Sequence, residues 1–245
     1  MSNAWRLIDS GQVGPPESAA MDDAILTCHA DGAVPNTLHF YVRSTPTVSI
    51  GYFQRAEEAL DLQECARRGV AIVRRRSGGS TIYTDQGQLV FAVIAPVEEV
   101  ARGGANAFSR VCGAVADALR SFGIDARHRP VNDVEVGGRK VSGSAQLRRH
   151  ESVLHHGTVI VDSDIDAMDA VLRGAGPRPS ARVTTLASLL PQPPSMGDLK
   201  SAMAESIGSV FHAELRTGSL VDRERELVGS SVRECYSRRE WNLRI

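Results

Sequence analysis

This sequence has almost no lysine. It also lacks the features that identify membrane proteins, secreted proteins and zinc-binding proteins. No run of about 18 apolar residues occurs, and residues 1–6 lack the apolar core of a secretory signal. We therefore expect a soluble, cytoplasmic protein that does not enter a membrane. The four cysteines are scattered and form no CxxC pair, so neither a zinc site nor a disulfide framework is expected.

Excess charge of one sign is also missing. The net charge of −1 argues against a general nucleic-acid binder. No internal repeat and no linker divides the 245 residues, of which 42% are hydrophobic, so one core is expected. We predict one α+β domain over residues 1–245, with a mixed, mainly antiparallel sheet flanked by helices.

Hydrophobic periodicity and turn residues predict the elements of this domain. Helices are expected over residues 17–30, 56–68, 105–122, 165–173, 199–211 and 220–236. Strands are expected over residues 5–9, 38–42, 47–52 and 70–73, with the last one buried, and another opens at residue 155. Two hairpins are expected: residues 82–83 with 89–94 around Asp85-Gln86-Gly87, and residues 132–136 with 139–141 around Gly137-Gly138.

Lys140 is one of only two lysines among 28 basic residues, and it directly follows the Gly137-Gly138 turn. A chain that otherwise supplies positive charge with arginine has a reason to place a compact, mobile ammonium here. The small residues of segment 142–145 would let a ligand approach the backbone closely. An exposed strand lysine beside a flexible turn is the alternative interpretation, and the residues alone do not separate the two.

A second cluster follows the strand expected at residues 70–73. Three arginines, Arg74 to Arg76, precede Ser77 and the Gly78-Gly79 pair. Free backbone N–H groups of glycines beside guanidinium groups suit a phosphate or carboxylate oxygen. No Gly-Lys-Ser/Thr follows, so the loop is not a Walker motif. A solvated basic turn is the alternative.

These motifs carry a resemblance to a known family. Residues 74–79 before a hairpin resemble the RRxxGGG loop of the lipoate–protein ligase A family. Asn132-Asp133, residues 139–146 and His155-His156-Gly157-Thr158 resemble its ND, KxSGxAQ and HHGT motifs, in the same order. Both ends of the chain are similar to the ends of the family. The resemblance implies the catalytic fold shared by lipoate ligases, octanoyltransferases and biotin ligases.

The resemblance implies a lipoate–protein ligase, in which ATP activates lipoate to lipoyl-AMP. The lipoyl group then passes to a lysine of a lipoyl carrier domain, such as an E2 subunit or the glycine cleavage H protein. Lys140 is the expected catalytic residue, bridging the lipoate carboxylate and the α-phosphate. Asp133 is expected either to hold Mg²⁺ or to orient Lys140. The other expected contacts to substrate or nucleotide are Arg75, Ser77, Gly78, Gly79, Ser80, Ser142, Gly143, Ala145, His156, Gly157 and Thr158.

Two further expectations concern the pocket. The apolar segments 70–73 and 159–161 are expected to line it around the acyl tail. His155 and His156 are equally open to two interpretations, ligand contacts or strand-end histidines bonded to the backbone.

Three departures from the family pattern qualify the resemblance. Ser80 stands where the loop has its third glycine, and Thr84 stands where a histidine is usual. The sequence ends at residue 245 without the C-terminal accessory domain of longer ligases. We therefore expect adenylation to need a small, separately encoded accessory subunit, whereas transfer from pre-made lipoyl-AMP should not.

Two alternatives remain beside the ligase. An octanoyltransferase of this fold carries its acyl group on a cysteine, placed either before the lysine hairpin or after the His-Gly strand. Residues 131–133 and 163–190 contain no cysteine, and all four thiols are expected to be buried in the fold, so the ligase is favoured. A protein that only binds lipoyl carriers is the third class, and the presence of Lys140 and the glycine loop argues against it.

Overall fold

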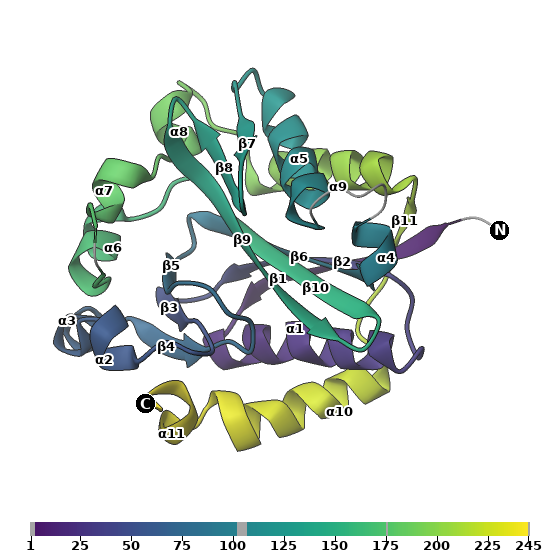
Figure 1. The fold of residues 1–245 in the computed structure, drawn as a ribbon, viewed down its shortest axis with the longest axis horizontal. Helices are drawn as coiled ribbons and strands as arrows, with labels where there is room; N and C mark the ends of the chain where they lie inside the picture. Colours follow the sequence, from purple (N-terminus) through teal and green to yellow (C-terminus); the bar gives the residue numbers. More distant parts are fainter. Residues whose placement is uncertain (1–2, 102–106, 175, 245) are drawn as a thin grey trace.

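A computed structural model describes residues 3–101, 107–174 and 176–244. It has a large and a small sheet, with helices on both faces of the large one (Figure 1). The large sheet has the strand order β11-β1-β2-β6-β10-β9-β8-β7. Its strands are β1 Ala4–Val13, β2 Thr37–Arg43, β6 Gln88–Pro96, β7 Arg127–Arg129, β8 Asp133–Val136, β9 Arg139–Arg149, β10 Ser152–Ile160 and β11 Glu214–Thr217.

Pairing in the large sheet is mixed. β1 pairs in parallel with β2 and with β11, and the remaining pairs are antiparallel. The small sheet has the order β4-β3-β5, with β3 Thr47–Ile50, β4 Ala71–Arg74 and β5 Ile82–Thr84. The predicted fold class, α+β with a mainly antiparallel sheet, is confirmed.

Two layers of helix bury the two faces of the large sheet. On one face, α5 Ala107–Arg120 and α9 Met196–Phe211 contribute to the main core together with Phe91 and Val93 of β6. On the other face, α1 Pro15–Ala30 packs Ile25 and Leu26 against Ala92 and Ile94 of the same strand. The central strand β6 is therefore apolar along almost its whole length.

A further helix covers α1 from outside. α10 Asp222–Ser231 lies along α1, and a π-helical turn, Val232–Tyr236, follows it (Figure 1). Glu224 of α10 is fully buried and accepts hydrogen bonds from both terminal nitrogens of Arg6 in β1, at 2.6 and 2.9 Å. This bidentate pair anchors α10 to β1. The remaining helices are α2 Ala56–Ala59, α3 Leu62–Arg68, α4 Val97–Val100, α6 Ile165–Val171, α7 Pro179–Arg182, α8 Leu186–Leu189 and α11 Arg239–Asn242.

Three expectations about elements were wrong. The helix expected over residues 56–68 is two helices, because Leu60 forms a bridge to Leu172 and Asp61 caps a new helix through the N–H groups of Gln63 and Glu64. The hairpin expected around residues 85–87 does not form, since β5 pairs with β3 and β6 pairs with β2 and β10. The strand expected to be buried at residues 70–73 is a half-buried edge strand.

The lysine hairpin forms as expected. β8 and β9 pair across Gly137 and Gly138, which both have positive φ (56° and 77°), as a tight two-residue turn requires. The helix expected from residue 105 begins, within the described residues, at Ala107, and residues 105–106 lie outside them. Within the described parts of the chain, no helix is long and apolar enough to cross a membrane.

Candidate functional site

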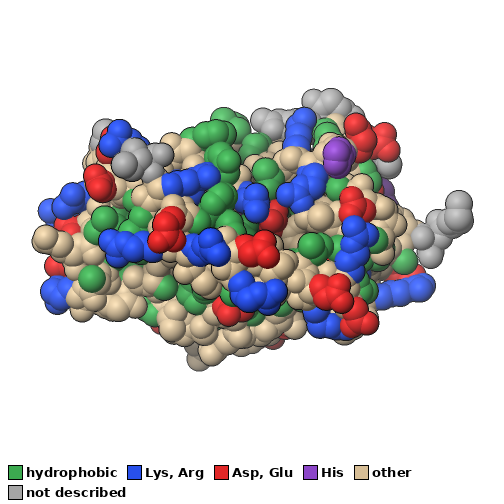
Figure 2. All heavy atoms as spheres, turned by 90° about the horizontal axis from the view of Figure 1, so that it is seen from below, with side chains coloured by type: hydrophobic (Ala, Val, Ile, Leu, Met, Phe, Trp, Pro, Cys, Tyr) green, Lys and Arg blue, Asp and Glu red, His purple; other side chains and the backbone are tan. Residues whose placement is uncertain are grey.

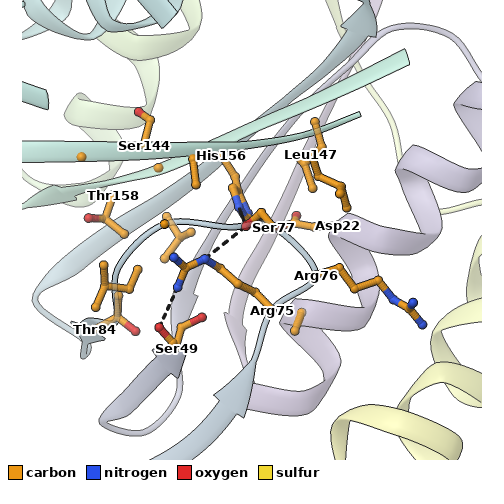
Figure 3. A pocket seen from close by; sticks show the side chains of 18 of the residues that line it. Asp22, Ser49, Arg75, Arg76, Ser77, Thr84, Ser144, Leu147, His156 and Thr158 are labelled. Carbon is orange, nitrogen blue, oxygen red and sulfur yellow. Dashed lines mark hydrogen bonds and ion pairs between the residues drawn. The ribbon is translucent and has the colours of Figure 1, made fainter. Parts of the chain in front are cut away.

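A cavity that is partly open to solvent lies where β9 and β10 meet the loop after β4 and helix α1 (Figure 3). Most of the predicted site residues line it. They are Arg75, Ser77, Gly79, Ser80, Lys140, Gly143, Ala145, His156, Gly157 and Thr158. Gly78, Asp133 and Ser142 were also predicted, but they stand behind or beside the lining. Two stretches far apart in the sequence thus form one site.

The loop of residues 77–80 is held from below by Arg75. This guanidinium donates to the carbonyl oxygens of Ser49, Gly78 and Ser80 at 2.7–2.8 Å, and its Nε–H donates to Ser77 Oγ at 3.1 Å. Burial lowers the pKa of Arg75 to about 10, so it remains a cation at neutral pH. Arg75 therefore shapes the loop and brings positive charge under it.

Glycine is required where this loop meets its neighbours. A Cβ on Gly51 would lie 2.0 Å from the carbonyl oxygen of Gly79. Gly79 itself has φ of +90°. In the described part of the chain, the backbone N–H groups of Gly78, Gly79 and Ser80 have no protein acceptor. They are available to an anionic or carbonyl oxygen of a ligand.

Lys140 is positioned by the hairpin and by a carboxylate. Its Nζ lies 2.6 Å from Asp133 Oδ1, and Gly143 gives it room, because a Cβ there would lie 2.2 Å from Nζ. Asp133 also accepts from Arg129 at 2.7 Å. A carboxylate that already faces two cations has little negative charge left for a divalent ion. The geometry favours Asp133 as the residue that orients Lys140.

The two histidines left open by the sequence point to opposite sides of β10. His155 is fully buried against Phe91 and Phe108. Burial, together with the nearby His156 and His128, lowers its pKa to about 3. His156 lines the cavity and lies 2.7 Å from Ser77 Oγ through Nε2. Strand alternation therefore makes His155 part of the core and His156 part of the site.

Sequence reasoning missed the acidic side of the cavity. Asp22 of α1 is buried and accepts hydrogen bonds from His39 (3.1 Å), Tyr41 (3.3 Å) and His156 (3.4 Å). Burial works against the charged form, but the bonds to His156 and His39 outweigh it and hold the pKa of Asp22 below its usual range. The signal was present in the sequence, since a carboxylate pair, Asp22-Asp23, interrupts an otherwise apolar helix face.

Asp23, the neighbour of Asp22 on α1, forms ion pairs with arginines. It pairs with Arg76, and Arg149 also reaches it. Burial nevertheless raises the pKa of Asp23, despite both arginines. Arg76 points away from the loop toward the C-terminal helices (Figure 3), with its guanidinium 5.3 Å from the centre of the Trp241 ring. Arg76 thus ties the site to the C-terminal segment.

One end of the cavity is apolar. Leu147 of β9 and Leu154 of β10 form a cross-strand pair that lines it, whereas Val90 of β6 lines the cavity farther along, opposite Thr158. The walls expected from residues 70–73 and 159–161 were wrong, because Val70 packs in a second core beside the small sheet and Val159 and Val161 belong to the main core. The apolar side chains of β6, β9 and β10 that face α1 take their place.

No cysteine lines the cavity. All four thiols are free and buried, as expected from the sequence. Cys112 on α5 comes nearest, with Sγ 3.8 Å from Ser144 Oγ, and burial raises its pKa to about 11. A thiol with so high a pKa is protonated at neutral pH and is a poor nucleophile.

Curated proteins of similar sequence contradict the expectation that this chain is an ATP-dependent ligase. Octanoyltransferase LipM of Symbiobacterium thermophilum is 31% identical over 274 residues, covering all of both chains. Octanoyltransferase LipM of Brevibacillus brevis is 29% identical and covers 98% of this chain and 99% of its own. The predicted function, ATP-dependent activation of lipoate, was therefore wrong, and the runner-up, octanoyl transfer, is favoured. An accessory subunit was expected only for adenylation, so without that activity there is no reason to expect one.

Solved structures and a family model agree on the wider assignment. A lipoate-protein ligase A bound with ATP has a TM-score of 0.87 at 28% identity and covers 99% of both chains. The bipartite lipoate protein ligase of Thermoplasma acidophilum, solved in a study that includes its E2 lipoyl domain, has a TM-score of 0.85 at 27% identity, covering 99% of this chain and 96% of its own. Residues 14–208 match the model of the lipoyl protein ligase A/B catalytic domain. The chain therefore belongs to this family, as an enzyme of the lipoate and octanoyl transferase group.

Proposed function

We propose that this chain transfers an octanoyl group from a thioester donor to the lysine of a lipoyl carrier domain. Full-length relatives named octanoyltransferase support the acyl group. The archaeal ligase studied with its E2 lipoyl domain supports the acceptor class. A thioester is already activated, so transfer from it to an amine needs no nucleotide.

The observation that carries the proposal is the division of the cavity into an apolar end and a cationic, donor-rich end. Leu147 and Leu154 accommodate the far end of a short saturated chain. Lys140 lies against Gly143 at the other end, and the 77–80 loop lies between the two ends, against His156 and Ala145. An octanoyl thioester has the same division, with seven apolar carbons and one polar carbonyl.

Lys140 and the loop act where charge develops. When a nucleophile adds to the acyl carbon, the carbonyl oxygen becomes negative. An ammonium held by Asp133 at 2.6 Å and N–H groups without protein acceptors stabilise this oxygen without rearranging. The carrier lysine enters from the open side of the cavity, and its neutral amine forms the final amide.

The test compares the two lysines of the chain. Purified protein is incubated with octanoyl-coenzyme A or an octanoyl carrier protein and a lipoyl domain, and the domain is weighed by mass spectrometry. Wild type should add one octanoyl group. Lys140→Ala should reduce the rate at least a hundredfold. Lys200→Ala is the matched control, since Lys200 pairs with Asp9 outside the cavity, and it should transfer like wild type. Equal rates for both variants would contradict the proposal.

A further inference from the structure

Ser77 stands in a chain of contacts that its place in the glycine loop does not require. Its Oγ lies 2.7 Å from His156 Nε2, and His156 Nδ1 lies 3.4 Å from Asp22 Oδ2. Figure 3 shows Ser77 and His156 turned toward each other, with Asp22 beside them. The three residues come from the loop after β4, from β10 and from α1. Hydroxyl, imidazole and carboxylate are therefore arranged in series at the cavity wall.

The hydrogen-bond network is compatible with proton transfer from Ser77 to His156. Arg75 Nε–H can only donate, so Ser77 Oγ accepts that bond, and its own hydrogen is donated to His156 Nε2 in the tautomer that leaves this nitrogen without a proton. His156 then carries its ring proton on Nδ1, which faces the carboxylate of Asp22. In this tautomer the imidazole accepts the serine proton. The 3.4 Å bond is long, as such bonds commonly are before substrate binds.

Asp22 is itself held in place. His39 Nδ1 lies 3.1 Å from Oδ1, and the Tyr41 hydroxyl lies 3.3 Å from Oδ2. Ser10 in turn contacts the other nitrogen of His39 at 2.9 Å. The pKa of Asp22 lies below its usual range, so the carboxylate is charged at neutral pH and stabilises an imidazolium at His156. A buried carboxylate with this many partners is more than a solvated surface charge.

We propose that Ser77 is the nucleophile of a Ser77–His156–Asp22 triad and carries the acyl group during transfer. The inference rests on the proposed function and names the atom that replaces a cysteine thiol in a cavity that has none. Arg75 assists, because a cation bonded to Oγ favours the developing alkoxide.

Both half-reactions balance with these groups alone. Ser77 Oγ attacks the carbonyl carbon of the octanoyl thioester while His156 Nε2 takes the hydroxyl proton. The C–S bond breaks, and the departing thiolate receives that proton, which leaves an octanoyl ester on Ser77 and a free thiol. The neutral amine of the carrier lysine then attacks the ester carbon. His156 takes a proton from this amine and returns it to Ser77 Oγ, and an amide forms.

Donors for the oxyanion lie in the same loop. Within the described residues, the N–H groups of Gly79 and Ser80 have no protein acceptor, and both residues line the cavity. The same cavity holds Lys140 as a second source of positive charge. Nucleophile, base, orienting carboxylate and oxyanion donors are thus all present in one cavity.

The experiment looks for the ester directly. The full chain is mixed with octanoyl-coenzyme A without a lipoyl domain, quenched in acid, weighed intact and mapped by peptide fragmentation. One octanoyl group should be found on Ser77, stable to neutral hydroxylamine as an oxygen ester. Ser77→Ala should lose the adduct and at least a thousandfold in transfer rate. Ser77→Cys should regain an adduct, now as a hydroxylamine-labile thioester, together with measurable transfer.

Ser201→Ala is the matched control, because Ser201 is an exposed serine on α9 and should leave both readouts unchanged. A Ser77→Ala variant that transfers at the wild-type rate would overturn the triad and leave the proposed function standing. So would an adduct on any cysteine, or loss in Ser77→Ala with neither a wild-type adduct nor rescue by Ser77→Cys. Wild-type protein that forms neither adduct nor octanoylated domain would overturn both proposals.

Discussion

At the scale of single residues, the pair His155-His156 shows how one step along a strand changes the chemistry of a side chain. Both are imidazoles on β10, yet His155 packs between Phe91 and Phe108 while His156 faces the cavity and Ser77. Burial removes the water that would hydrate the charged form of His155. This lowers its pKa, and no carboxylate is among the groups that act on it. Only His156 is available for proton transfer.

The buried His155 predicts a specific pH dependence of stability. Its folded pKa of about 3 lies below the usual 6.5, so the unfolded chain takes up a proton that the folded chain refuses. This contribution is absent above pH 6.5 and lowers the free energy of unfolding as the pH falls toward 3. Between pH 7.5 and 5 the wild type should lose about 2 kcal/mol that His155→Gln does not lose. Urea midpoints at both pH values measure this, and parallel losses would contradict it.

At the scale of elements, the strand β9 and its hairpin turn set the position of Lys140. Gly143 leaves the space that the ammonium uses, since a Cβ there would lie 2.2 Å from Nζ and 2.3 Å from Cε. The end of a lysine side chain moves easily, so the fold should tolerate a methyl group while the charge is displaced. A substitution at Gly143 should therefore displace the Lys140 ammonium without a large change in the free energy of unfolding.

Gly143→Ala tests that separation. It should change the free energy of unfolding by less than about 1 kcal/mol and reduce transfer about a hundredfold, because the ammonium is displaced from the acyl carbonyl. Gly113→Ala on α5 is the matched control, with nothing within 4 Å of its new Cβ. It should stabilise the protein by about 0.5–1 kcal/mol and leave transfer unchanged. Urea denaturation and a transfer assay give both numbers; full activity in Gly143→Ala would refute the positioning.

Local patterns predicted the elements well where one periodicity governed them, and the motifs picked out most of the residues that line the cavity. The β8–β9 hairpin, helix α1 and the group formed by Lys140, the 77–80 loop and His156 follow from turn residues, apolar spacing and the family motifs. The pairing of β5 with β3 instead of β6 depends on contacts distant in sequence, which no local pattern encodes.

Asp22 was missed for the same reason. Its role arises from His39, Tyr41 and His156, which are 17, 19 and 134 residues away. The acyl-tail walls were misplaced because apolar composition marks burial but does not say which of two cores a side chain joins. The activity itself was misassigned because the missing cysteine was given too much weight.

At the scale of the whole molecule, residues 51–54 and the C-terminal residues 241–244 meet at Arg74, directly before the glycine loop. On the underside, where α10 lies, basic and acidic side chains are interspersed (Figure 2), and exposed pairs such as Arg225–Asp222 add little stability. The buried Arg74 differs. It donates to the carbonyl oxygens of Gly51, Tyr52 and Gln54 on one side and of Trp241 and Arg244 on the other.

Arg74→Met should therefore lower the free energy of unfolding by about 3 kcal/mol or more, since it leaves several buried carbonyl groups without donors. Transfer should fall as well, because the segment of Gly51 supports Gly79. Arg67→Met, at an exposed arginine paired with Glu64, is the control and should leave the free energy of unfolding nearly unchanged. The urea midpoint measures both, and equal midpoints would show that Arg74 braces nothing.

The most direct test of octanoyl transfer is the identity of the donor. Wild-type protein and a lipoyl domain are incubated in two parallel reactions, one with octanoyl thioester and no nucleotide, the other with free octanoate, ATP and Mg²⁺. The mass of the domain is followed over time. The account predicts that the domain gains one octanoyl group in the first reaction and remains unmodified in the second. Modification only in the second reaction would contradict it.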